Sequence, residues 1–119
     1  MKASITNYRQ SPRKVRLVAN AVKGKTLANA DSVLAYMVKR GSEPMSKLIK
    51  SAAANAANVG IDTNTLIIKN IEVNKGIVLK RSMPRAMGVA KPINKRTSHV
   101  VVTLAPTILK NKKSKINKK

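Results

Sequence analysis

Clustered basic side chains are the groups of this sequence best suited to binding a ligand. Residues 76–99 contain no acid and six basic groups: Lys80, Arg81, Arg85, Lys91, Lys95 and Arg96. A second basic cluster near the N-terminus consists of Arg13, Lys14 and Arg16. Guanidinium and ammonium groups bind phosphate oxygens without any catalytic partner. A solvated polar face usually mixes both signs of charge, so we favour phosphate contact over a merely solvated surface.

The other polar residues form no catalytic or metal-binding set. His99 is the only histidine, and at the head of a β-branched run a histidine more often packs or hydrogen-bonds than catalyses. The four acids are scattered: Asp31, Glu43, Asp62 and Glu72. Cysteine is absent, which excludes disulfides and zinc fingers, and the glycines match no nucleotide-binding fingerprint. We therefore predict no enzyme, no metal site and no cofactor.

The overall charge points to a polyanionic partner. Lys and Arg number 25 against 4 acids, which gives a net charge of +21. The apolar fraction of 43% is that of a folded protein, and 119 residues support one domain. All four acids lie within residues 26–72, a nearly neutral scaffold between basic ends. The only aromatic residues are Tyr8 and Tyr36, too few for a platform that stacks successive bases.

A β-hairpin over residues 76–99 should carry most of the basic groups. Strand-like runs enclose it, with alternating apolar residues over 71–79 and a β-branched run over 99–104. Turn formers mark its middle: Pro84, Gly88 and Pro92. The chain thus leaves along one strand and returns along the other.

Folding this hairpin about residues 86–89 pairs Val73 with Val102 and Leu79 with Arg96. Each strand of the hairpin then has about nine residues beyond Gly76, which gives the hairpin a reach of ~30 Å. Its distal part has few large apolar residues, and an isolated two-stranded ribbon is marginal in water. We predict that this hairpin over residues 76–99, called the arm below, projects from the domain and becomes ordered when it binds a polyanion.

Three helices should pack on one face of the sheet. Apolar residues spaced by three and four predict helices over residues 12–23, 27–40 and 42–59. Their predicted core faces comprise Val15, Val18, Ala19, Val22, Ala30, Val33, Leu34, Met37, Val38, Met45, Leu48, Ile49, Ala52, Ala53 and Ala56. An N-terminal strand over residues 3–8 would make the sheet three-stranded and antiparallel. The fold class is α+β, with a long protruding β-hairpin.

One domain, residues 1–105, accounts for these elements. The tail over 106–119 has six lysines in its last ten residues. We interpret it as a basic tail that is disordered until bound, and a merely solubilising extension is the alternative. The N-terminus lacks a signal peptide and no run reaches 18 apolar residues, so we expect a cytoplasmic location.

Several segments together resemble one protein family. They are SPRK followed by VRLVANAVKGK, then KSAAANAAN, EVNKG and KRSMPRAMGVAKPINKRTSHVVV. The motif residues of the arm are Lys80-Arg81, Pro84-Arg85-Ala86, Gly88 and Lys95-Arg96-Thr97-Ser98-His99. Over about residues 3–105 the chain resembles the family of large-subunit ribosomal protein twenty-two. It departs from the family pattern at Met87, Val89 and Pro92.

The resemblance implies a structural protein of the large ribosomal subunit that binds its rRNA and supports assembly. Its expected rRNA-binding residues are Arg13, Lys14, Arg16, Lys80, Arg81, Arg85, Lys91, Lys95, Arg96, Thr97, Ser98 and His99. The tip of the hairpin is expected to line the nascent-peptide exit tunnel through Pro84, Arg85, Ala86, Met87, Gly88, Val89, Ala90 and Lys91. The implied partners are large-subunit rRNA, neighbouring ribosomal proteins and the nascent polypeptide, with no membrane and no homo-oligomer.

Two other classes of protein fit parts of the pattern. A nucleoid-type DNA-bending protein also inserts proline-bearing β arms, but it needs a dimer interface, and this chain has no evident spare apolar face. A membrane-surface binder needs bulky apolar residues, and Trp and Phe are absent. We therefore expect RNA to be bound by shape and charge rather than by base reading.

Overall fold

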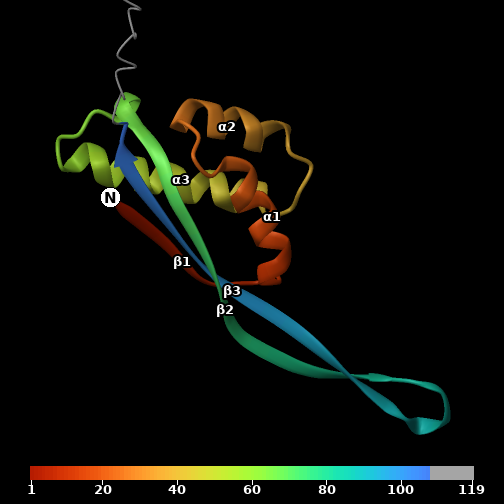
Figure 1. Cartoon of the computed structure of the whole chain (residues 1–119). Coiled ribbons are helices and arrows are strands. Elements are labelled where there is room, and N and C mark those ends of the chain that lie inside the picture. Colours follow the sequence, from red (N-terminus) through yellow and green to blue (C-terminus); the bar gives the residue numbers. More distant parts are fainter. Residues whose placement is uncertain (108–119) are drawn as a thin grey trace, which may run out of the picture.

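Three helices lie against a three-stranded antiparallel sheet in the computed structural model, which describes residues 1–107 (Figure 1). In chain order the elements are β1 (Lys2–Tyr8), α1 (Pro12–Val22), α2 (Leu27–Tyr36), α3 (Ser42–Asn58), β2 (Leu66–Pro84) and β3 (Ala90–Pro106). A short 3-10 turn over Thr63–Thr65 precedes β2, and a second one over Ala86–Gly88 connects β2 to β3. This confirms the predicted α+β class and the protruding hairpin.

The sheet order is β1-β3-β2, so β3 is the central strand. The predicted hairpin register was wrong, because Val73 pairs with Val100 and Leu79 pairs with Lys95. The turn centres on Met87, one half-residue earlier than expected, which shifts every pair by one. A β-bulge nearer the domain shifts the pairs below it by one more.

Alternate residues of the sheet face the helices and form the core. The buried apolar residues of the sheet are Leu66, Ile68, Ile71, Val73, Val100, Val102 and Leu104. The predicted stripe of α1 is buried throughout, and Met45, Leu48 and Ile49 of α3 are buried with it. The later half of α3 presents Ala52 and Ala56, both fully buried, which lets this helix approach β1 and β3 closely.

Helix α2 ends earlier than the sequence predicted. It stops at Tyr36, Met37 is extended, and Val38 is 97% exposed rather than in the core. The Ser42 hydroxyl donates to the carbonyls of Met37 and Lys39, at 3.3 and 2.7 Å. Gly41 occupies the N-cap position of α3, and Ser42 satisfies free carbonyls after α2.

The outer half of the hairpin projects beyond the helices (Figure 1). The molecule measures 83 × 40 × 23 Å and its radius of gyration is 19.8 Å. A compact domain of this size would have a radius of about 13 Å. No side chain of residues 77–96 is buried, and Met87 at the tip is 99% exposed. The arm therefore contributes little to the protein's own core.

The described structure ends just inside the predicted basic tail. Pro106 is the last residue of β3, and the Thr107 N–H donates to the Thr65 carbonyl at 2.7 Å. The lysine-rich remainder, residues 108–119, lies outside the described residues.

Gly76 is expected to be essential for the base of the arm. A Cβ at this position would overlap Thr97 Oγ1 and would lie 3.2 Å from the Thr97 carbonyl carbon. Gly76→Ala should therefore destabilise the protein by about 1–3 kcal/mol, the usual cost of overpacking. Chemical denaturation measures this loss, and amide exchange should show faster opening at the base of the hairpin.

The matched control for that substitution is Gly88→Ala at the tip. Gly88 has φ +69° and no atom near its would-be Cβ, so only the backbone penalty of about 1 kcal/mol applies there. Its effect on amide exchange should stay at the tip. Equal effects of the two substitutions would show that the Thr97 contact does not constrain the base.

Candidate nucleic-acid interface

Two β-bulges meet on β3 where the arm leaves the helices. On one side, Gly76 and Ile77 of β2 stand opposite Thr97 alone. On the other side, Thr6 and Asn7 of β1 stand opposite the single residue between Ser98 and Val100. Bulges bend a strand and increase its twist. These two bulges set the direction in which the arm projects.

Side chains of β3 hold both bulges in place. The Thr97 hydroxyl donates to the Ile77 carbonyl at 2.6 Å. The Asn7 N–H donates to His99 Nδ1 at 3.1 Å, which places the proton of a neutral imidazole on Nε2. Asn7 adopts φ +54°, a left-handed conformation that Asn tolerates better than most residues. The base of the arm is therefore locked by specific hydrogen bonds.

The burial of Thr97 and Ser98 bears on their expected role. Thr97 is 4% exposed and Ser98 is 0% exposed, so Ser98 offers no surface to a partner and Thr97 offers only the small part that lines a pocket at the base of the arm. His99 is half-buried and already uses Nδ1. These three residues stabilise the base of the arm, and their expected contact with rRNA stays a prediction.

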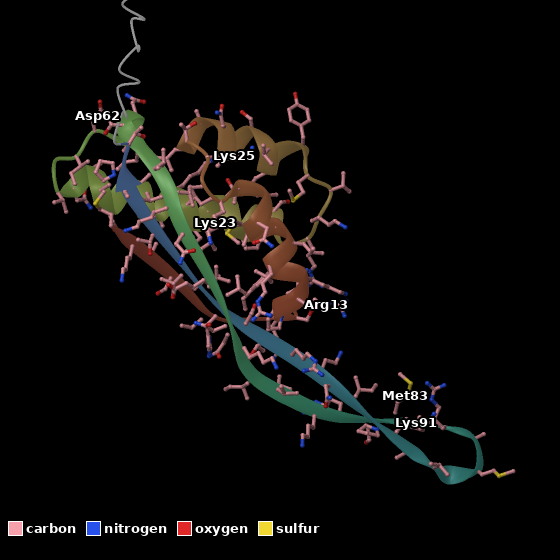
Figure 2. The ribbon with its side chains drawn as sticks, in the orientation of Figure 1. Arg13, Lys23, Lys25, Asp62, Met83 and Lys91 are labelled. Atoms are coloured by element: carbon pink, nitrogen blue, oxygen red, sulfur yellow. The ribbon has the colours of Figure 1, made fainter. Side chains whose placement is uncertain are left out.

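All six basic residues of the arm are exposed, and they occupy both faces of the ribbon. Residues directly opposite in an antiparallel pair share a face. Lys95 lies opposite Leu79 on one face, and Arg96 lies opposite Val78 on the other. Figure 2 shows Lys91 next to its cross-strand partner Met83 near the tip. A ribbon with positive charge on both faces can bind two RNA segments at once.

The predicted tunnel-lining tip is accessible along its whole length. Residues 84–91 are all exposed, from the end of β2 through the 3-10 turn to the start of β3. The turn is closed by the Arg85 N–H, which donates to the Val89 carbonyl at 2.8 Å. Met87 and Gly88 both have positive φ, as a tight reversal requires.

The basic cluster of α1 lies at the same end of the domain as the base of the arm. Figure 2 shows Arg13 at the end of α1 that lies closest to the arm. Arg13, Lys14 and Arg16 are exposed, and the positive N-terminal end of the helix dipole adds to their charge. Arg16 Nη2 also donates to the Val73 carbonyl at 3.0 Å, so this residue ties α1 to β2.

Arg9 is a candidate contact that the sequence reasoning missed. It follows β1 and lines a small pocket at the base of the arm, together with Asn7, Ile77, Leu79 and Thr97. The sequence feature that could have indicated Arg9 as a contact is its position among the seven basic groups of residues 1–25, a segment without any acid. Only the fold brings Arg9 beside the arm.

The acids of the scaffold are paired with local groups. Asp31 accepts from the Ser46 hydroxyl at 2.9 Å and lies 3.4 Å from Lys50, and these contacts lower its pKa in that order of importance. A hydrogen bond from Lys47 at 2.8 Å likewise lowers the pKa of Glu43. Both ion pairs lie in the helical part of the fold. Within residues 1–107 no ion pair involves the arm, so its charge is unopposed.

Other kinds of site are not found in the described part of the chain. Residues 1–107 contain no cluster of three or more His, Cys, Asp or Glu side chains that could hold a metal ion. None of the described helices has the length and apolarity needed to cross a membrane.

Comparison with known proteins matches this arrangement to one family. A family model described as ribosomal protein L22p/L17e matches residues 3–105. The chain belongs to the L22p/L17e family of ribosomal proteins. Family membership confirms the resemblance seen in the motifs. It makes the chain a ribosomal protein rather than an enzyme, with the ribosome as its location.

Individual relatives in this family are similar over most of their length. The large ribosomal subunit protein uL22 of Desulfitobacterium hafniense strain DCB-2 is 46% identical over 104 residues, covering 87% of this chain and 91% of the relative. The protein of that name from Mesoplasma florum is 49% identical over 105 residues, covering 87% and 94%. The protein from Pelobacter propionicus is 46% identical over 104 residues.

Proposed function

We propose that this chain is a structural constituent of the large ribosomal subunit that binds its rRNA, supports assembly and lines the nascent-peptide exit tunnel with its tip. The observation that carries the proposal is the arm, a projecting two-stranded ribbon with basic side chains on both faces and no acid. Such a ribbon buries little of its own surface, so its stability depends on a partner. Phosphates on both sides supply that partner.

The helical part supports an anchoring role at the surface of the particle. Its basic cluster on α1 lies near the base of the arm, so both can contact the same RNA region (Figure 2). Two of the four acids, Asp31 on α2 and Glu43 on α3, form ion pairs with lysines of α3. Contacts to phosphates position the protein and carry no sequence information themselves. The proposed partners are therefore large-subunit rRNA, neighbouring proteins of the subunit and the nascent polypeptide.

The salt dependence of binding tests the phosphate contacts. Binding of the full chain to large-subunit rRNA should weaken steeply with salt, because each contact releases counterions. Replacing Arg13, Arg16, Arg81, Arg85, Lys95 or Arg96 singly with Ala should make the log–log slope shallower by roughly 0.7 to 0.9. Filter binding or fluorescence anisotropy over a salt series measures the slope.

Two controls define that experiment. Lys69→Ala removes the same charge near the start of β2, at the opposite end of that strand from the arm, and should leave the slope almost unchanged. Duplex DNA added as a competitor should displace the rRNA poorly, whereas a DNA-bending protein would prefer it. A slope that none of the six substitutions alters would refute the assigned contacts.

A further inference from the structure

The pocket at the base of the arm has apolar walls in an otherwise basic surface. Its walls are formed by Asn7 and Arg9 at the end of β1, by Ile77 and Leu79 of β2, and by Thr97 of β3. Ile77 is 63% exposed although it stands next to the domain. The lining is mainly apolar, and the one charged residue at its edge is Arg9.

These apolar side chains have no role in the protein's own core. Leu79 and Ile77 lie past the last residue of β2 that packs under the helices, which is Val73. The locked bulge holds Ile77 in this exposed position, since its carbonyl accepts the Thr97 hydroxyl. A bulge commonly re-aims a side chain next to a binding site. The exposed aliphatic surface is therefore suited to contact a ligand outside the chain.

The surrounding groups restrict the chemistry of the ligand. Lys95 is the cross-strand neighbour of Leu79 and shares its face, so a second positive charge lies beside the pocket that Arg9 and Leu79 line. A ligand with a flat apolar part and an attached anion satisfies both the walls and the charges. An unpaired nucleotide has this form, and unstacked bases pack on apolar side chains and on guanidinium planes.

Asn7 supplies the remaining group that a base requires. In the described structure its side-chain amide has no hydrogen-bond partner, while its backbone N–H is engaged by His99. An amide offers both donors and an acceptor, and so can match the edge of a base. A single aliphatic pocket of this kind needs no aromatic platform, which agrees with the scarcity of aromatic residues.

We infer that the pocket between Arg9, Ile77 and Leu79 binds one unpaired base extruded from large-subunit rRNA, with its phosphate held by Arg9 and Lys95. This inference rests on the proposed function, because it requires rRNA as the partner. It adds one specific contact to binding that otherwise depends on shape and charge.

The test uses the full chain and deproteinised large-subunit rRNA. The double variant Ile77→Ser with Leu79→Ala removes the apolar walls without changing any charge. Its affinity should fall about tenfold, the usual effect of losing one stacked base, while the salt slope stays the same. One base protected from dimethyl sulfate in the wild-type complex should become reactive, and backbone protection from hydroxyl radicals should persist.

Val78→Ser is the matched control, because Val78 lies on the opposite face of the same ribbon, across from Arg96. It should leave both the affinity and the base protection unchanged. Arg9→Met is a second variant that keeps the aliphatic stem, and it should expose the same base while making the salt slope shallower by about 0.7.

The outcomes separate this inference from the proposed function. If the wild type shows no salt-dependent binding to the rRNA, both fail. If the wild type binds and the double variant matches Val78→Ser in affinity and base protection, the pocket does not hold a base and the proposed function stands. If Arg9→Met exposes a base that the double variant leaves protected, the pocket is likewise not its site.

Discussion

Replacing all six basic residues of the arm with glutamine should lower the affinity for large-subunit rRNA by on the order of 10⁴ at 0.1 M salt. Each phosphate contact raises the binding affinity by about 0.7 of a decade at this salt concentration through counterion release, and the contributions of six contacts add on the logarithmic scale. The residues are Lys80, Arg81, Arg85, Lys91, Lys95 and Arg96. Anisotropy titration over a salt series measures both the affinity and the slope, which should become shallower by roughly 4.

The fold should survive this change. All six side chains are exposed, and none forms an ion pair within residues 1–107. Removing like charges from a chain of net charge +21 also reduces self-repulsion. The midpoint of chemical denaturation should therefore be equal to or higher than that of the wild type.

A control of nearly equal charge separates the arm from a general electrostatic effect. The scaffold over residues 26–72 carries five basic groups: Lys39, Arg40, Lys47, Lys50 and Lys69. Replacing them with glutamine should weaken binding far less, because none of these groups lies on the arm. Similar losses from the two variants would mean that net charge, and not the arm, drives binding.

The helices α1 and α3 were predictable because their signals are local. The spacing of Val15, Val18 and Val22 fixes one buried face of α1, and all three are buried as expected. The charge pattern was equally informative, since a run of basic groups without acids does not depend on the fold. These features predicted the class of fold and the class of partner.

The hairpin register depended on contacts that no local pattern reveals. The bulge at Gly76 exists because β2 approaches Thr97 closely enough to exclude a Cβ, and the Thr97 hydroxyl then bonds to Ile77. Thr97 and Ser98 were expected to be polar binding residues, and in the folded chain both are buried beside the two bulges. Whether a polar side chain near a bulge is exposed depends on the tertiary structure and not on the residue type.

The early end of α2 has the same kind of cause. Apolar spacing continues through Met37 and Val38, so periodicity alone extends the helix. The chain must instead turn into α3, and the Ser42 hydroxyl stabilises that turn by bonding to two carbonyls. Arg9 was missed for a related reason, since its position beside Ile77 and Leu79 exists only in the folded chain.

Removing the tip should separate assembly of the subunit from the properties of its tunnel. Arg81 and Ile93 are direct cross-strand partners, so residues 82–92 can be replaced by Asn-Gly, a two-residue turn suited to a hairpin. Every deleted residue is exposed, so the core is unaffected. Four of the six basic groups of the arm remain, together with the cluster on α1. We expect the shortened protein to fold and to enter the large subunit.

The expected change is in the passage of nascent chains. The tip carries an exposed Met87 and a half-exposed Val89 on a turn stiffened by Pro84 and Pro92. These groups suit a rigid end that faces a solvent-filled space. Without them the tunnel should be wider at this point, and pausing by a tunnel-sensing nascent peptide should be lost or strongly reduced.

The experiment expresses the shortened protein as the only copy and measures subunit incorporation and pausing in the same cells. A tip of eleven Gly and Ser residues in place of 82–92 keeps the length and removes the side chains, so it distinguishes a need for bulk from a need for the specific groups. Failure of incorporation would make the tip an assembly element. Normal incorporation with unaltered pausing would show that the tip does not act on the nascent chain, because the subunit would then contain the protein without its tip and pausing would still be normal.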